Sequence, residues 1–227
     1  MIRSDFVSKI KNIRLERAFN PYADRCAKYD PEHAPEIRAS LLSNLIEAAE
    51  KAEVEAIWVG RDLGYRGGRR TGLALTDDMH FHEHLSRWKL SLDRPTKGNP
   101  IAERTAGVIW TELEQISAPI FLWNVFPFHP FREGNEFSNR PHTKVERRIG
   151  MELLLDLIKL IKPKHLVAVG NDAESALHEL NLRQPVIKVR HPSYGGQSVF
   201  SRQIRDLYEL TPLDLFSGAS ENAVSAL

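Results

Sequence analysis

The apolar residues of the chain gather into short runs that end in glycine or a polar residue. Such runs lie at residues 55–60, 119–124, 165–170 and 186–190. Short runs that are apolar almost throughout are typical of strands that are buried on both faces of a sheet. The pattern therefore predicts four interior β-strands.

Stretches with helical periodicity lie between these runs. Ile37, Leu41 and Leu45 recur at a spacing that puts them on one face of a helix over residues 37–53. We expect further helices at about 101–116, 144–161, 172–180 and 198–210, and a short helix near the N-terminus. Because strands alternate with helices, the pattern predicts an α/β fold, a three-layer sandwich with a central four-stranded parallel sheet flanked by helices.

The length and composition fit one domain over residues 1–227. Within it we expect an N-terminal arm at 1–36 and a loose, small and polar tail at 211–227. The single cysteine, Cys26, excludes a disulfide within the chain and a cysteine-rich zinc or iron–sulfur site. No run approaches the ~18 apolar residues that span a membrane, and the first residues lack the apolar core of a signal peptide. We therefore expect a soluble, cytoplasmic protein.

Charge is nearly balanced, with 31 basic and 30 acidic side chains. Nucleic-acid-binding proteins are often strongly basic, so a protein of this composition would need a local basic face to bind DNA. The glycine-rich loop over residues 60–75 carries four arginines and could supply that face. It lacks the sequence of a phosphate-binding loop, and a solvated, flexible loop is the alternative interpretation.

Polar residues follow each of the four predicted strands. Arg61 and Asp62 follow the first, Asn124 ends the second, Asp172 comes just after the third, and His191 follows the fourth. Ligands of open parallel sheets bind at the carboxyl ends of the strands. The sequence therefore predicts that a carboxylate, an amide and an imidazole meet at one edge of the sheet.

The other histidines have a simpler interpretation. A metal site is conceivable where histidines alternate at residues 80–84 near two aspartates, but side chains in such a polar loop are usually exposed. We interpret His129 and His142 in the same way, and we expect no metal. A lone histidine such as His191 is more often structural than catalytic, but the proline and glycines around it favour a fixed, functional loop.

Three segments resemble, in order, the motifs of the uracil-DNA glycosylase superfamily. They are Gly60-Arg-Asp-Leu-Gly64, Leu122-Trp-Asn124 and His191-Pro-Ser193, and the resemblance extends over about residues 15–210. The flanking residues resemble a bacterial branch without an iron–sulfur cluster. The resemblance implies a uracil-DNA glycosylase-like fold and a monomeric enzyme without cofactors. Its partner would be DNA, single- or double-stranded.

The resemblance also implies roles for individual residues. Asp62 would orient the attacking water and stabilise the cationic sugar, and His191 would donate a hydrogen bond to the departing base. Asn124 would read the base edge, Leu75 would stack on the base, and Gly64 stands where uracil enzymes place a tyrosine beside C5. The expected base-recognition residues are Asn124, Leu75, Gly64 and Tyr65.

Contacts with DNA are expected from arginines and from the third motif. Tyr194 is the bulky candidate for a wedge in the duplex, because glycine follows it where relatives have leucine. The expected DNA-binding residues are Arg61, Arg66, Arg69, Arg70, Arg140, Ser193 and Tyr194. No lysine lies in the motifs, so we expect a monofunctional glycosylase that leaves an abasic site.

Several hypotheses about function remain open. The substrate is expected to be uracil, another deaminated base, or a 5-modified pyrimidine such as modified phage cytosine, because Gly64 would leave room beside C5. Excision of a phage base would serve anti-phage defence. Arg61 and Leu63 depart from the first motif and favour a non-catalytic nucleic-acid-binding module. A nucleotide-binding protein with another α/β fold is opposed by the missing phosphate-binding sequence.

Overall fold

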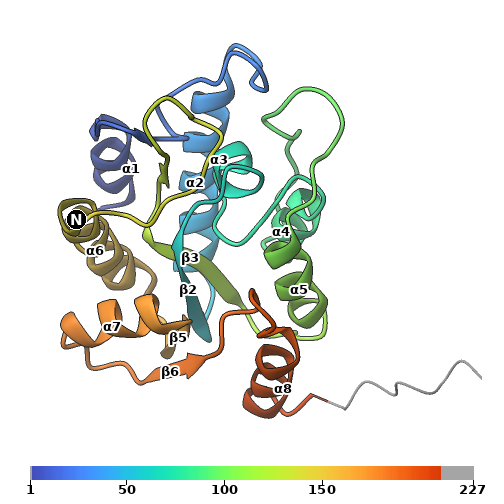
Figure 1. Ribbon diagram of the computed structural model, residues 1–227. Coiled ribbons are helices and arrows are strands. Elements are labelled where there is room, and N and C mark those ends of the chain that lie inside the picture. The colour runs from blue at the N-terminus through green and yellow to red at the C-terminus, as the bar shows by residue number, and fades with distance from the viewer. Residues whose placement is uncertain (1, 211–227) are drawn as a thin grey trace, which may run out of the picture.

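A four-stranded parallel sheet forms the centre of the protein in the computed structural model, which describes residues 2–210 (Figure 1). The predicted loose tail at 211–227 lies outside the described residues. The strands are β2 (Ala56–Asp62), β3 (Ile120–Phe126), β5 (His165–Val169) and β6 (Val186–Val189), in the order β3-β2-β5-β6. Each corresponds to one of the apolar runs, which confirms the predicted sheet.

Helices cover both faces of this sheet, because alternate residues of each strand point to opposite sides. Ile57 and Val59 of β2 join one hydrophobic core, and Ala56 and Trp58 join the other. The first core is completed mainly by α1 (Arg3–Asn12), α2 (Ala34–Glu50), α6 (Lys144–Ile161) and α7 (Asn171–Glu179). The second is completed by α5 (Arg104–Leu113) and α8 (Gln197–Leu207). The three-layer sandwich is therefore confirmed (Figure 1).

The N-terminal segment is part of this core. Phe6 and Ile10 of α1 are fully buried among residues of the first core. Farther along, β1 (Ala18–Phe19) pairs antiparallel with β4 (His129–Pro130), which ties the segment to the loop that follows β3.

The sequence pattern did not predict two short helices. They are α3 (Gly68–Thr71) and α4 (Phe81–Arg87). The expectation of exposed histidines in this region is confirmed for His82 and was wrong for His84 of α4, which is buried and has its Nδ1 2.9 Å from Thr76 Oγ1. Burial lowers the pKa of His84 to about 3. His129 is also buried, so its expected exposure was wrong as well.

Within residues 2–210, no three histidine, cysteine, aspartate or glutamate side chains cluster as a metal site would require. The helices in that range are all too short or too polar to cross a membrane.

Helix α6 lies directly against β3, the strand that carries Asn124. Gly150 makes this contact possible: a Cβ there would overlap Val125 O and lie 2.9 Å from Phe126 Cα. The absence of a side chain at this one position therefore fixes how closely the helix approaches the carboxyl end of the strand.

Candidate active site

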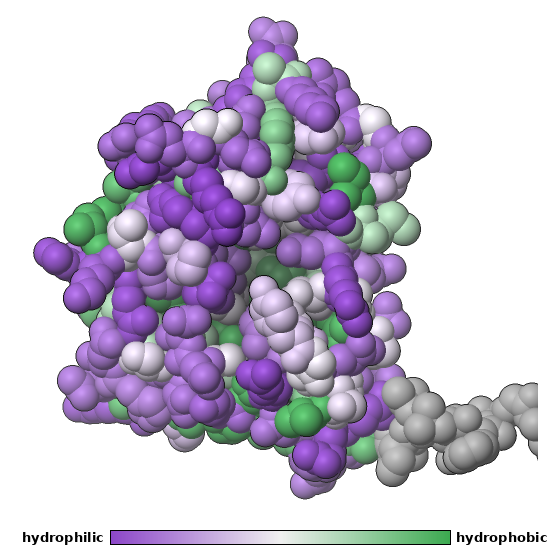
Figure 2. Space-filling view, in the orientation of Figure 1, coloured by the Kyte–Doolittle hydropathy of each residue, from purple (hydrophilic) through white to green (hydrophobic). Residues whose placement is uncertain are grey.

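A cavity of about 460 Å³ opens at the carboxyl ends of β2, β5 and β6. Residues from several distant segments line it, among them Asp62, Gly64, Leu75, Glu103 and His191. The space-filling view shows a hollow near the middle of this face, with an apolar floor and a hydrophilic rim (Figure 2). The cavity lies where the topology of an open parallel sheet predicts a ligand site.

Asp62 ends β2 and is held by two side chains. Its Oδ2 accepts a hydrogen bond from Arg61 Nε at 2.6 Å, and its Oδ1 accepts one from His142 Nδ1. Arg61 NH1 also lies 3.5 Å from Asp172. A carboxylate has about four acceptor positions, so Asp62 keeps the capacity to bind a water molecule while its orientation is fixed.

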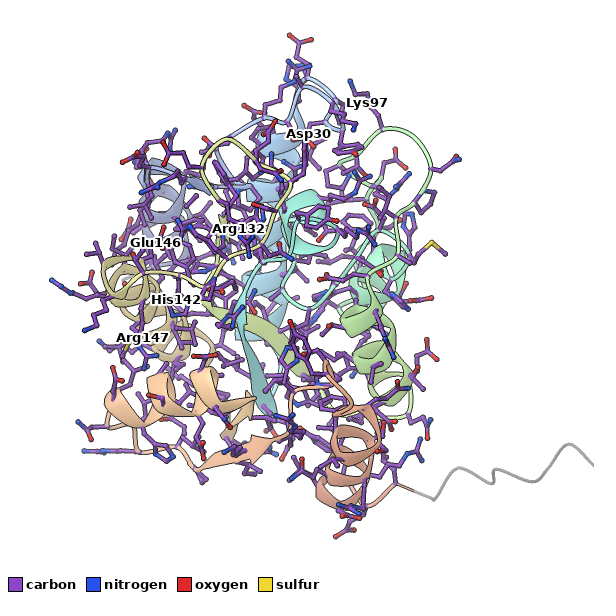
Figure 3. The ribbon with its side chains drawn as sticks, in the orientation of Figure 1. Asp30, Lys97, Arg132, His142, Glu146 and Arg147 are labelled. Atoms are coloured by element: carbon purple, nitrogen blue, oxygen red, sulfur yellow. The ribbon has the colours of Figure 1, made fainter. Side chains whose placement is uncertain are left out.

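The start of α6 brings His142 to this aspartate. Thr143 caps the helix: its Oγ1 accepts from the Glu146 N–H, and its own N–H donates to Glu146 Oε2 at 2.6 Å. His142 is the residue immediately before this capping box, and both His142 and Glu146 can be found beside the helix in Figure 3. The expected exposure of His142 was wrong, because its side chain is buried against Asp62.

His191 has a defined tautomer. Its Nδ1 accepts the backbone N–H of Ser193 at 3.1 Å and lies 2.7 Å from Ser193 Oγ. The proton of a neutral ring therefore sits on Nε2, which is left as a hydrogen-bond donor. Burial, Arg61 and Arg190 together hold the pKa of His191 below its usual value. The ring is therefore uncharged at neutral pH.

Asn124 lies behind the wall of the cavity and is only 1% exposed. A Cβ at Gly60 would overlap Asn124 Oδ1 and lie 2.9 Å from Leu75 Cδ2, so both side chains pack over that glycine. Leu75 itself lines the cavity and has a left-handed backbone, with φ of 54°. Asn124 Oδ1 has no hydrogen-bond partner among residues 2–210. The amide thus retains an unused acceptor beneath Leu75.

The space beside Gly64 is filled. A Cβ at Gly64 would overlap Glu103 Oε1, so the expectation of an open pocket there was wrong. The sequence around Gly64 could not reveal this, because Glu103 comes from the start of α5. Burial, followed by the charge of Asp77, raises the pKa of Glu103 to about 7, and Arg66 opposes the shift.

Two of the arginines predicted to bind DNA are buried. Arg69 is 2% exposed and Arg70 is 3% exposed. Arg69 donates to Glu136 Oε2 at 2.8 Å, and Arg70 donates to Asp78 Oδ2 at 2.6 Å. The predicted phosphate contacts of Arg69 and Arg70 were therefore wrong, because buried guanidinium groups engaged by carboxylates cannot reach a phosphate.

The other predicted DNA contacts differ in accessibility. Arg66 is exposed, and Arg61 has a side chain that is 40% exposed at the cavity. Arg140 also lines the cavity, but Glu146 accepts two hydrogen bonds from it, at 2.7 and 2.8 Å. Tyr194 is 98% exposed and has φ of 52°, so its ring projects from a tight turn at the cavity rim.

Tyr65 and Ser193 lie in different surroundings. Tyr65 is not among the residues that line the cavity; its N–H donates to Asn139, and its hydroxyl accepts from Arg66 Nε at 2.9 Å. Ser193 lines the cavity and holds the ring of His191.

Comparison with known proteins identifies a family and solved structures of similar fold. The family model described as "Uracil DNA glycosylase superfamily" matches residues 48–207. The crystal structure of wild-type Pedobacter heparinus SMUG2 is similar in fold, with a TM-score of 0.60 and 14% sequence identity over 92% of this chain and 98% of that chain. No curated protein matches the sequence.

Proposed function

Because the chain belongs to the uracil DNA glycosylase superfamily, we propose that it flips a base out of DNA and hydrolyses its N-glycosidic bond to leave an abasic site. The chain is a DNA glycosylase, a hydrolase of N-glycosyl bonds. The proposal adds the mechanism, the residues and the kind of base. It needs no cofactor, and a single copy of the chain holds all the side chains that it uses.

One observation carries the assignment of residues: Asp62 and His191 line the same cavity, although they come from the carboxyl ends of different strands. The glycosidic bond of a base inside a duplex is inaccessible to an enzyme, so the base must leave the stack and enter such a cavity. The volume of about 460 Å³ falls within the range of small-molecule sites, roughly 300–1,000 Å³.

Asp62 and His191 then act on opposite charges that develop in the transition state. The sugar becomes positive, and the Asp62 carboxylate stabilises it and orients the water that attacks it. The departing base becomes negative, and the Nε2–H of His191 donates a hydrogen bond to it. Ser193 supports this role because it occupies Nδ1 and thereby selects the donor tautomer.

The base is held by the residues around these two groups. Leu75 offers an apolar surface for stacking, and Asn124 has an unused Oδ1 beneath it that can accept a hydrogen bond from a base edge once Leu75 moves aside. Gly64 would lie beside the base, and Tyr65, the next residue, would support the same loop.

The DNA backbone is held by residues at the rim. Arg61 and Arg66 are the accessible cations that would contact phosphates, with Arg140 and Ser193 in supporting positions. Tyr194 would fill the space that the flipped base leaves in the duplex, because its exposed ring has an apolar face of suitable size.

Two kinds of base are the candidate substrates. Uracil or another deaminated base would make the protein a repair enzyme, and a 5-modified pyrimidine such as modified phage cytosine would make it an anti-phage enzyme. The carboxyl group of Glu103 beside Gly64 supports a base with a polar substituent. Gly64→Tyr should then abolish cleavage of a 5-substituted base, since its side chain would displace Glu103 from the place beside the substituent.

The decisive experiment incubates the protein with oligonucleotides that contain uracil, hypoxanthine, 5-hydroxymethyluracil or modified phage cytosines and detects abasic sites by alkaline cleavage. We expect Asp62→Asn and His191→Ala each to lower the cleavage rate by a factor of about 100 or more. Asp206→Asn and His178→Ala are controls, because both residues are exposed on helices outside the cavity. Cleavage that survives unchanged in Asp62→Asn would overturn the proposed mechanism.

A further inference from the structure

Glu103 is a carboxylic acid in the candidate active site that the proposed mechanism does not use. It lines the cavity together with Asp62 and His191. It precedes the first residue of α5, and its backbone N–H donates to the buried Asp77 Oδ2 at 2.6 Å. Asp77 also accepts the N–H groups of Met79 and His80. The backbone of Glu103 is therefore firmly anchored.

The side chain of Glu103 lies over the loop that follows β2. A Cβ at Gly64 would overlap Oε1, and a Cβ at Gly67 would overlap Oε2. Both glycines thus make room for this carboxyl group. The group covers one side of the cavity, where Gly64 and Gly67 would otherwise expose only backbone.

This carboxyl group is short of partners. Among residues 2–210, no side chain or backbone group forms a hydrogen bond or ion pair with Oε1 or Oε2. The charge of Asp77 disfavours ionisation of the group, and the charge of Arg66 favours it. Because its pKa is about 7, the group is protonated in a large share of molecules at neutral pH. It can then donate one hydrogen bond and accept others.

The carboxyl group lines the cavity, so a ligand bound there can hydrogen-bond to it in place of solvent. We infer that Glu103 selects the base, and that its carboxyl group hydrogen-bonds a hydroxyl- or amino-bearing substituent on the base edge that faces Gly64. This inference rests on the proposed function. A base with only hydrogen or a methyl group at that edge would leave the carboxyl group without a partner. The preferred substrate class is therefore a base that carries a polar substituent, such as a hydroxymethyl group.

The test compares matched pairs of oligonucleotides that differ only in this substituent: uracil with 5-hydroxymethyluracil, and cytosine with 5-hydroxymethylcytosine. The readout is the ratio of single-turnover cleavage rates within a pair. In the wild-type protein we expect the hydroxymethylated base to be cleaved about 10- to 100-fold faster, which is the usual worth of a specific base contact. In Glu103→Leu, which has no polar atom at this place, the ratio should fall to about 1.

Two further variants separate recognition from structure. Glu103→Gln keeps the shape and can still donate and accept hydrogen bonds, so it should retain most of the preference. Glu114→Gln removes an exposed carboxylate from the end of the same helix and should leave the ratio unchanged. If Glu103→Leu does not fold, as judged by its melting curve, Glu103→Ser replaces it, because its shorter side chain cannot reach the place of the carboxyl group.

The outcomes are distinct. A wild-type ratio near 1, or a ratio that Glu103→Leu leaves unchanged, overturns the inference and leaves the glycosylase mechanism standing. A wild-type protein that cleaves no base in any pair or in the wider panel overturns the proposed mechanism, and the inference falls with it. Equal losses on both members of a pair in Glu103→Leu assign the residue a structural role and also overturn the inference.

Discussion

At the scale of single residues, the site depends on how its few polar atoms are already occupied. Asp62 accepts hydrogen bonds from Arg61 and His142, and His191 accepts one from Ser193. Each of these bonds restricts the orientation of a group that the proposed mechanism needs. Catalysis depends steeply on such orientation, because a small misplacement of a reacting group costs about 100-fold in rate.

His142 is therefore expected to act as a positioning residue for Asp62. His142→Ala should lower kcat by about 10- to 100-fold and change KM by less than about threefold, since His142 is not among the residues that line the cavity. His142→Asn should recover much of the rate, because its amide nitrogen can donate to the same carboxylate oxygen. Steady-state kinetics of both variants provide the measurement. A rise in KM with kcat unchanged, or no recovery in His142→Asn, would contradict this role.

Glu103 also has a predictable effect on stability. Its pKa is about 7 in the folded protein, against 4.5 for an ordinary glutamate. Because the folded protein holds this proton more tightly than the unfolded chain, the contribution is fully present below about pH 4.5 and is lost as the pH rises to about 7. The loss should be on the order of 1–3 kcal/mol.

Urea unfolding at several pH values between 4.5 and 8 measures this effect. Glu103→Gln carries no ionisable group, so its free energy of unfolding should fall less than that of the wild-type protein over this interval. The two proteins should therefore differ most at the alkaline end, where the variant is the more stable. Parallel pH profiles for the two proteins would show that folding does not raise the pKa of Glu103.

At the scale of elements, the contact between α6 and β3 sets the geometry of the site. Gly150 lies against the backbone at Val125 and Phe126, and α6 begins two residues after His142, which binds Asp62. The same helix therefore both supports the strand that carries Asn124 and presents the histidine that holds Asp62.

Gly150→Ala should be destabilising although alanine is the better helix former. The added methyl group would overlap Val125 O, so helix and strand must separate, which typically costs about 1–3 kcal/mol. Gly107→Ala in α5 is the matched control: its Cβ would meet nothing within 4 Å, and it should stabilise by about 0.5–1 kcal/mol. Urea unfolding of both variants gives the comparison. Equal changes in the two variants would contradict the proposed close packing.

At the scale of the whole molecule, electrostatics favour weak attachment to the DNA backbone. The net charge is only +1, and burial removes Arg69 and Arg70 from the cations available to DNA. Arg61, Arg66 and Arg190 remain accessible near the cavity. The proposed mechanism therefore requires that specificity come mainly from contacts with the base, because phosphate contacts are few.

The salt dependence of DNA binding tests this conclusion. With two or three neutralised phosphates, the plot of log binding constant against log salt concentration should have a slope of about −2 to −3. Fluorescence anisotropy with an oligonucleotide that lacks a cleavable base provides the binding constants. Arg66→Gln should reduce the slope by about 1. Lys51→Gln, at the opposite edge of the sheet where β2 begins, should not change it. A slope near −8 would instead point to an extensive basic surface.

Much of the fold could be predicted from the sequence. The strands were predictable because an interior strand needs a continuous apolar run, and such a run is a local property of the chain. The parallel order of strands and helices then placed Asp62 and His191 at one edge, since the carboxyl ends of parallel strands meet there. Helix α4 was not predicted because its histidines make the segment look polar. One of them, His84, lies on the buried face of the helix.

The sequence by itself determined which polar groups follow the strands, because the strands and their ends depend on the pattern of apolar and polar residues within short segments. Only the tertiary structure decided what those groups contact. Glu103 fills the space beside Gly64, His142 binds Asp62 across a separation of 80 residues, and Arg69 and Arg70 are turned inward. These contacts join segments whose local patterns carry no information about one another, so packing alone sets the protonation, orientation and exposure on which the chemistry depends.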